Sequence, residues 1–269
     1  MGIINSFLSD LPMYLLSLPV LLLAFSVHET AHGYVAYRLG DPTARSLGRL
    51  TLNPIKHIDI LGFISMLLFH IGWAKPVPVN TRYFKNPKRD MALTGAAGPL
   101  SNLVLALIHL VLLRVVLIFA ADAFYGDAVA FFHTGEKGSL TFTLMSLMVY
   151  LLYLGVIMNI SLAIFNLIPV PPFDGSRIFY AFLPTRMYFA VMKYERIIMI
   201  VILVLFATGF LSTPLSYLLN LFEEGLFTIS GMYAGEPFTD GIFTYDISKT
   251  YGVFANMVNY INKLLTIAL

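Results

Sequence analysis

Long apolar runs separated by short polar segments dominate the chain. Four runs stand out, at residues 11–37, 91–121, 142–168 and 197–211. A helix needs about 20 apolar residues to cross the hydrocarbon core of a bilayer. The pattern therefore predicts four membrane-spanning helices, the last one extended by about a turn at each end to reach that length.

A fifth apolar run, at residues 58–73, is too short for a full crossing and has basic residues on both sides. It predicts a re-entrant or interfacial element, with a tilted pair of short segments as the alternative. The stretch "GRLTLNP" at 48–54 alternates polar and apolar residues, as a half-buried strand does. The prolines of "KPVPVN" at 75–80 exclude a helix and permit an edge strand.

These elements together predict the fold class. We expect an all-α polytopic membrane protein, a bundle of about five to six transmembrane segments. A short β-strand or re-entrant region lies between its first and second long spans. No stretch is long enough for a separate soluble domain, so residues 1–269 are predicted to form one membrane-embedded domain. Its core covers about residues 11–212, and the topology of the tail, 213–269, is left open.

The composition agrees with a membrane protein. Hydrophobic residues make up 58% of the chain and charged residues 12%, with a mean hydropathy of +0.79. Soluble domains carry roughly a quarter charged residues. The net charge of +2 gives no indication of a nucleic-acid partner. Because the chain has no cysteine, a metal site must use His, Asp, Glu or water.

Basic residues orient the predicted spans. Residues 38–57, 75–90 and the segment after Ile168 hold 13 of the 17 Lys and Arg residues. Cytoplasmic loops are enriched in these residues. The charge pattern therefore predicts a multi-pass protein of the cell membrane with its N-terminus outside.

The first span carries the sequence "HETAH" at residues 28–32. On a helix, His28 and His32 share one face and can bind one zinc ion, while Glu29 can take a proton from the bound water. Packing histidines beside an unrelated Glu are the alternative, but ionisable groups inside a span usually mark function. His28 lies ten residues, about 15 Å, from Arg38, which predicts a site towards the cytoplasmic side.

A catalytic zinc needs a third protein ligand. With no cysteine available, the candidates are Asp174, His57, Asp59 and the remaining histidines. Asp174 lies in "NLIPVPPFDG", where prolines end a span that returns to the side of the HETAH motif. An unwound segment at membrane depth is tolerated where it lines a cavity or is buried in protein.

A second polar position lies in "GPLSN", at residues 98–102. Asn102 lies at a depth close to that of His28, and it shares a helix face with Gly98. The spacing alone equally supports two interpretations. Asn102 forms an interhelical hydrogen bond in a small-residue packing patch, or its amide donates to a substrate carbonyl or oxyanion.

The motifs HETAH, GPLSN and NLIPVPPFDG, in this order, resemble the site-2 protease family of intramembrane zinc metalloproteases, peptidase family M50. The resemblance covers about residues 20–180, includes "LNPIKHIDILG", and is to the compact prokaryotic type without PDZ or CBS domains. It implies one Zn²⁺ per chain, with Glu29 as general base and Asn102 as a substrate-orienting or oxyanion-stabilising group. The implied metal ligands are His28, His32 and Asp174, and Asn166 would shape the segment that carries Asp174.

The expected activity is that of a zinc-dependent metalloendopeptidase acting on peptide bonds within or near transmembrane segments. Its partners would be the lipid bilayer and the transmembrane helix of a membrane-protein substrate, and homo-oligomerisation is left open. An unwound substrate could pair with the segments near Leu50 and Val77 by strand addition. We expect His57 and Asp59 to fix the loop before the short apolar run.

Two alternatives remain at this point. One is another membrane HExxH peptidase whose third ligand is a Glu on a later helix, for which the spans after Asp174 offer Glu195. The other is a non-catalytic membrane scaffold or carrier. An intact HETAH motif together with Asp174 argues against the second.

Overall fold

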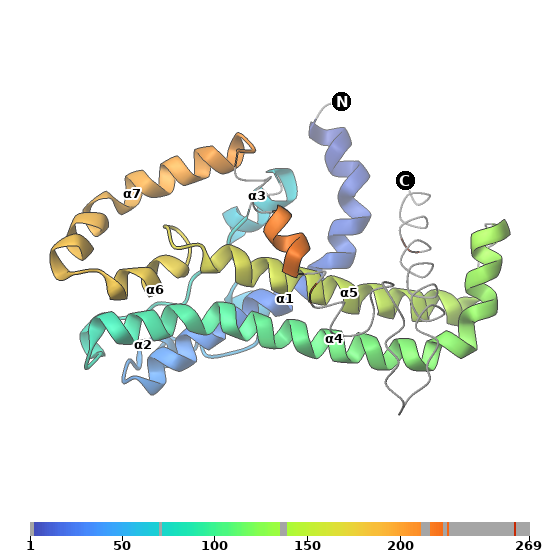
Figure 1. The fold of residues 1–269 in the computed structure, drawn as a ribbon, viewed down its shortest axis with the longest axis horizontal. Helices are drawn as coiled ribbons and strands as arrows, with labels where there is room; N and C mark the ends of the chain where they lie inside the picture. Colours follow the sequence, from blue (N-terminus) through green and yellow to red (C-terminus); the bar gives the residue numbers. More distant parts are fainter. Residues whose placement is uncertain are drawn as a thin grey trace. The chain divides into compact units, whose positions relative to one another are not determined.

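The computed structural model describes residues 3–69, 72–134, 139–210, 216–222, 225 and 261. These residues are mostly helical, and no β-strand occurs among them (Figure 1). The elements in chain order are α1 Ile3–Arg38, α2 Thr43–Ser46, η1 Pro54–Lys56, α3 Ile60–Phe69, η2 Thr81–Tyr83, α4 Pro87–Thr134, α5 Leu140–Leu167, α6 Gly175–Phe182 and α7 Thr185–Ala207.

Three of the described helices are long and apolar enough to cross a membrane. They cover Tyr14–Arg38, Pro87–Phe119 and Leu140–Leu167, and they match three of the four long runs in the sequence. Helix α7 covers residues 197–207 of the fourth run but is not among the three helices that could span a membrane. Its first half carries charged side chains, so its apolar part is shorter than a bilayer crossing needs. A total of five to six spans stays a prediction.

The region between the first two spans contains the ten-residue helix α3 and an isolated antiparallel bridge between Ile58 and Ala74. The expected strands at 48–54 and 75–80 are not confirmed. In residues 75–80 the two prolines have no N–H. The Lys75 N–H donates to the His57 carbonyl beside the isolated bridge, and the amides of Val77 and Asn80 donate to side-chain carboxylates. Whether α3 is re-entrant stays a prediction.

The backbone divides into two compact units. Unit 1 includes Met1–Val20 and Ala106–Ile157, and unit 2 includes Leu21–Leu105 and Met158–Asn220. All five residues proposed for the site fall in unit 2. The prediction of a single domain over the whole chain stays a prediction, and most of the tail after residue 213 lies outside the described residues.

Unit 1 contains the part of α4 that begins at Ala106 and the part of α5 that ends at Ile157. Large apolar side chains fill its interior, with Leu113, Leu117 and Phe142 fully buried. A methyl group at Gly155 would overlap the ring of His109, so the glycine lets α5 approach α4 closely at this point. His109 therefore packs between the two helices.

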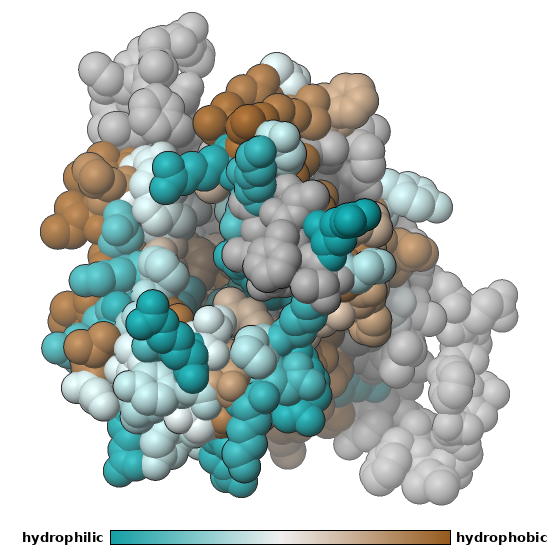
Figure 2. All heavy atoms as spheres, turned by 90° about the vertical axis from the view of Figure 1, so that its left-hand side faces the viewer, coloured by the Kyte–Doolittle hydropathy of each residue, from teal (hydrophilic) through white to brown (hydrophobic). Residues whose placement is uncertain are grey.

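Unit 2 places the second half of α1 alongside the first part of α4, where the HETAH and GPLSN motifs face each other (Figure 1). Figure 2 shows hydrophilic side chains gathered at the end of this unit that holds α2 and the start of α4. Exposed basic side chains at or beside helix ends include those of Arg38, Arg45, Arg82, Lys85, Arg89 and Arg186. The apolar helices and this charged end fit a protein embedded in a membrane.

Candidate metal centre

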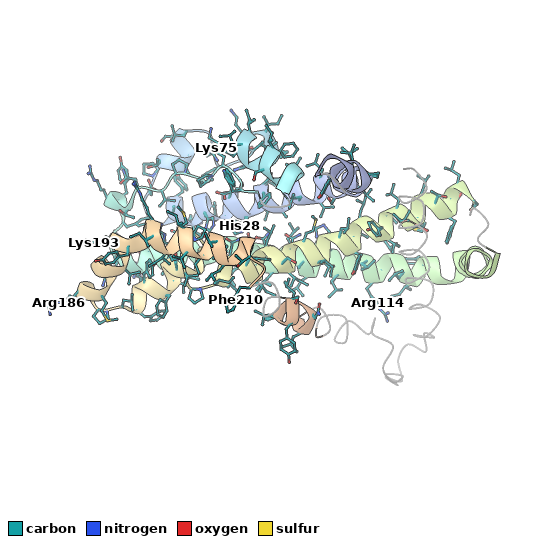
Figure 3. The ribbon with its side chains drawn as sticks, turned by 90° about the horizontal axis from the view of Figure 1, so that it is seen from above. His28, Lys75, Arg114, Arg186, Lys193 and Phe210 are labelled. Atoms are coloured by element: carbon teal, nitrogen blue, oxygen red, sulfur yellow. The ribbon has the colours of Figure 1, made fainter. Side chains whose placement is uncertain are left out.

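Three side chains converge in the interior of unit 2. The Nε2 atoms of His28 and His32 lie 3.0 Å apart, and Asp174 Oδ2 lies 3.0 Å from the first and 3.1 Å from the second. Both histidines are buried in α1, where Figure 3 labels His28. The structure thus brings together the three residues that the motifs suggested as ligands, although 142 residues separate His32 from Asp174.

The outer ring nitrogens determine how the two imidazoles are presented. His28 Nδ1 donates to Asn102 Oδ1 at 2.5 Å, and His32 Nδ1 donates to the backbone carbonyl of Thr94 at 2.6 Å. A carbonyl oxygen can only accept, so in each neutral ring the proton is on Nδ1. Both Nε2 lone pairs therefore face the Asp174 carboxylate, an arrangement that needs a cation between the three groups.

The geometry of the three donors fits zinc. A tetrahedral Zn²⁺ with bonds of about 2.0–2.1 Å would hold its ligand atoms roughly 3.3 Å apart, close to the observed separations. Gly98 leaves room at the same place, because a Cβ on it would lie 2.5 Å from both Nε2 atoms. Within the described part of the chain, this is the cluster of three His, Asp or Glu side chains able to hold a metal.

Asp174 reaches the cluster because α5 ends at Leu167 and α6 begins at Gly175. A side chain at Gly175 would overlap the backbone carbonyl of Leu167, so the turn between the helices requires a glycine. A cation held between the three groups would keep the Asp174 carboxyl ionised, as a metal ligand must be.

Glu29 lies on the neighbouring face of α1, and its carboxylate is held by the main chain. Its Oε2 atom accepts a hydrogen bond of 2.7 Å from the backbone N–H of Val77. Val77 belongs to residues 75–80, which we call the proline segment. The bond leaves Oε1 as the carboxylate oxygen available to take up a proton.

The proline segment is anchored at both ends. The Lys75 N–H donates to the His57 carbonyl at 2.8 Å, and the Asn80 N–H donates to Asp41 Oδ2 at 2.7 Å. The guanidinium of Arg49 adds a bond of 2.7 Å to the Lys75 carbonyl. These contacts fix Val77, and through it Glu29, without a regular strand.

A layer of loop residues covers the same face of α1. Thr30 Oγ1 and His57 Nε2 both donate to the Thr51 carbonyl at 2.7 Å. Asp59 Oδ1 accepts from the Gly62 N–H at 2.9 Å, which caps the start of α3. Both bonds agree with a structural role for His57 and Asp59, and neither residue is in the metal cluster.

The sequence of residues 16–211 matches the family model for peptidase family M50. This chain belongs to that family. It is 40% identical over 206 residues to YwhC of Bacillus subtilis (strain 168), covering 77% of this chain and 86% of that protein. It is 29% identical over 174 residues to Rip2 of Mycolicibacterium smegmatis, covering 62% of this chain and 57% of that protein. Both relatives are named as candidate zinc metalloproteases. No solved structure matches the chain.

The resemblance drawn from the three motifs is therefore confirmed. The chain is an M50 zinc metallopeptidase, a membrane hydrolase that uses Zn²⁺. Glu195, which a different kind of membrane HExxH peptidase would need as a ligand, pairs instead with Arg177 at 2.9 Å. This ion pair argues against the first alternative, in which Glu195 would be the third metal ligand.

The amides of this M50 peptidase lie behind the cluster. Asn102 is fully buried, and its Nδ2 donates to Asn159 Oδ1 at 2.8 Å and to the Ala24 carbonyl at 3.3 Å. Its contact with a substrate stays a prediction. Asn166 Nδ2 donates within α5, to the Leu162 carbonyl at 2.9 Å.

Asn159 is the residue that the sequence analysis missed. The signal was present, because Asn159 is an amide in the middle of an apolar run and lies seven residues before Asn166. A buried polar side chain in a span needs a partner. The sequence does not show that the partner of Asn159 is Asn102, on another helix.

Proposed function

We propose that this M50 peptidase hydrolyses peptide bonds within or near the transmembrane segments of other membrane proteins. The observation that supports this is the position of the metal cluster. His28 and His32 lie in Tyr14–Arg38, a helix long and apolar enough to span a bilayer, and Asp174 joins them from the turn after α5. A hydrolytic site at such a place serves substrates that are themselves in the membrane.

When bound by these three side chains, zinc supplies an acidified water and polarises the peptide carbonyl. The protein's own contribution is proton transfer by Glu29. Oε1 of Glu29 takes the proton of the attacking water and passes it to the leaving amine. The Val77 N–H keeps Oε2 fixed, so the carboxylate does not have to reorganise during the reaction.

We further propose that the site opens towards the cytoplasmic side of the cell membrane and that the protein crosses the membrane several times. Arg38 ends α1 about ten residues after His28, and exposed basic side chains gather at that end of unit 2. A site close to one face shortens the path that water must take through lipid. Strand addition of an unwound substrate along the proline segment fits the same position.

The test is a cleavage assay on candidate single-span proteins, using the purified full chain, with zinc content measured on the same samples. Glu29→Gln is expected to keep its zinc and to lose roughly 10²–10⁴-fold in cleavage rate. Asp174→Ala is expected to lose both zinc and cleavage. Asp59→Asn, outside the cluster, serves as the matched carboxylate control.

Either of two results would contradict the proposal. Normal cleavage by the Glu29→Gln variant would exclude Glu29 as the general base. Full zinc content in Asp174→Ala would exclude Asp174 as a ligand. A wild-type protein that binds zinc but cleaves no membrane-protein substrate would favour the non-catalytic scaffold.

A further inference from the structure

An amide pair formed by Asn102 and Asn159 lies behind the metal cluster. Asn102 is on α4 and Asn159 is on α5, and both side chains are fully buried. Asn102 bonds to His28 Nδ1 on one side and to Asn159 on the other. The pair therefore links three helices at the back of one metal ligand.

Hydrogen bonding determines which end of the Asn102 amide faces His28. Its Oδ1 accepts from His28, and the two hydrogens of Nδ2 go to the Ala24 carbonyl and to Asn159 Oδ1. If the amide turned over, its N–H groups would face the imidazole N–H, and its oxygen would face two acceptors. In a buried, apolar environment such unmade bonds cost far more than in water.

The two histidines differ in what holds them. His32 donates to the backbone carbonyl of Thr94, whose direction is fixed by α4 itself. His28 donates to a side-chain amide, whose direction depends on its own partners. Of these partners, the Ala24 bond is long at 3.3 Å, and the Asn159 bond is short at 2.8 Å. Asn159 therefore contributes most to the orientation of the Asn102 amide.

We propose that Asn159 is a positioning residue for the metal site. Its carbonyl oxygen holds the Asn102 amide with Oδ1 towards His28, which keeps the His28 proton on Nδ1 and the Nε2 lone pair free for zinc. This inference rests on the proposed function only in taking His28, His32 and Asp174 as the zinc ligands. Loss of an outer partner of a metal-bound histidine typically weakens metal affinity 10–100-fold.

The experiment compares zinc affinity in the full chain by chelator competition, together with the visible spectrum of the Co²⁺-substituted protein. Asn159→Leu removes the carbonyl acceptor at similar size and is expected to weaken zinc binding about 10–100-fold and to shift the Co²⁺ bands. Asn159→Asp keeps an acceptor oxygen and is expected to stay within about threefold of wild type in zinc affinity. Ser161→Ala, on the same helix, is the control for general damage to α5.

Wild-type zinc affinity and an unchanged Co²⁺ spectrum in Asn159→Leu would overturn the proposal. If cleavage falls in that variant while both metal readouts stay unchanged, Asn102 acts on the substrate instead, and the proposal is also overturned. If the leucine prevents folding, Asn159→Ala is judged by the same criteria. Because zinc affinity is measured without substrate, absence of cleavage in the wild type would contradict the proposed function and leave this inference intact.

Discussion

The two neighbouring faces of α1 at the HETAH motif are built in different ways. The metal face carries His28 and His32, whose partners are buried groups on α4 and the Asp174 carboxylate. The base face carries Glu29 and Thr30, whose partners are main-chain groups of loops without regular structure. Helix packing therefore positions the proposed metal ligands, whereas the proline segment and its loop layer position Glu29, the proposed general base.

This difference suggests that the two faces of α1 serve two separate requirements, rigid metal binding and access for the substrate. Metal binding needs several donors held to within a few tenths of an ångström, and packed helices provide that rigidity. A substrate, however, has to reach the cluster and the base, and loops can shift at lower cost than buried helices. The comparison predicts that damage to one face leaves the function of the other largely intact.

The largest effect is expected from filling the space on the metal face. In Gly98→Ala the new Cβ would lie 2.5 Å from Nε2 of both His28 and His32, where backbone of α4 cannot easily give way. We expect zinc content to fall to background and cleavage with it. Gly95→Ala, one turn earlier on α4, would meet Arg177 Cβ at 3.0 Å and the Asp174 backbone oxygen at 3.1 Å, a milder overlap, and should keep more zinc than Gly98→Ala. Full zinc in Gly98→Ala would show that the cluster is less constrained than its geometry indicates.

The next effect tests the base face. Val77→Pro removes the N–H that holds Glu29 Oε2. A hydrogen bond to a charged group contributes about 1.5–3 kcal/mol, so we expect kcat to fall roughly tenfold or more while zinc content stays unchanged. Val77→Ala keeps the N–H and should retain most of the activity.

Val79→Pro is the matched control for Val77→Pro. Within the described part of the chain, the Val79 N–H has no hydrogen-bond partner, so its loss should change kcat little. Equal losses in the two proline variants would mean that rigidity of the proline segment matters, rather than the bond to Glu29.

A smaller effect is expected where the loop layer touches α1. A Cβ at Gly33 would lie 2.7 Å from Leu50 Cδ2 and 3.0 Å from Val77 Cγ1. Because both atoms are ends of side chains, Gly33→Ala should push the loops outward and lower cleavage several-fold at unchanged zinc content. The double variant Gly33→Ala with Leu50→Ala removes the worst contact and should recover much of the loss. If the double variant recovered no cleavage, the contact with Leu50 would not be the cause of the loss in Gly33→Ala.

The same comparison explains how far the sequence alone could lead. HETAH predicted the metal face, because a helical period of 3.6 puts residues i and i+4 together wherever the helix lies. Asp174 could be proposed from its motif, and the structure brings it to the histidines. Three long helices also followed from apolar runs of sufficient length.

The base face did not follow from the sequence in the same way. The proline segment was expected to be a strand, and the structure does not confirm that, because its amides bond to single groups far apart in the chain. The bond from Val77 to Glu29 joins residues 48 positions apart and uses a backbone atom, which every residue except proline has. No side-chain pattern marks such a contact. Asn159 was missed for a related reason, since its partner lies on another helix.

The smallest effect is expected at Thr30, whose hydroxyl donates to the Thr51 carbonyl. Thr30→Val keeps the shape and removes the donor, while that carbonyl still accepts from His57 and is not left unsatisfied. The loss should therefore be about 1 kcal/mol in the free energy of unfolding, a decrease in Tm of about 2–4 °C for a chain of this size. Thr30→Ser keeps the donor and should match wild type. If Thr30→Val lowered zinc affinity instead, the two faces of α1 would be coupled, because the hydroxyl contacts only the loop layer.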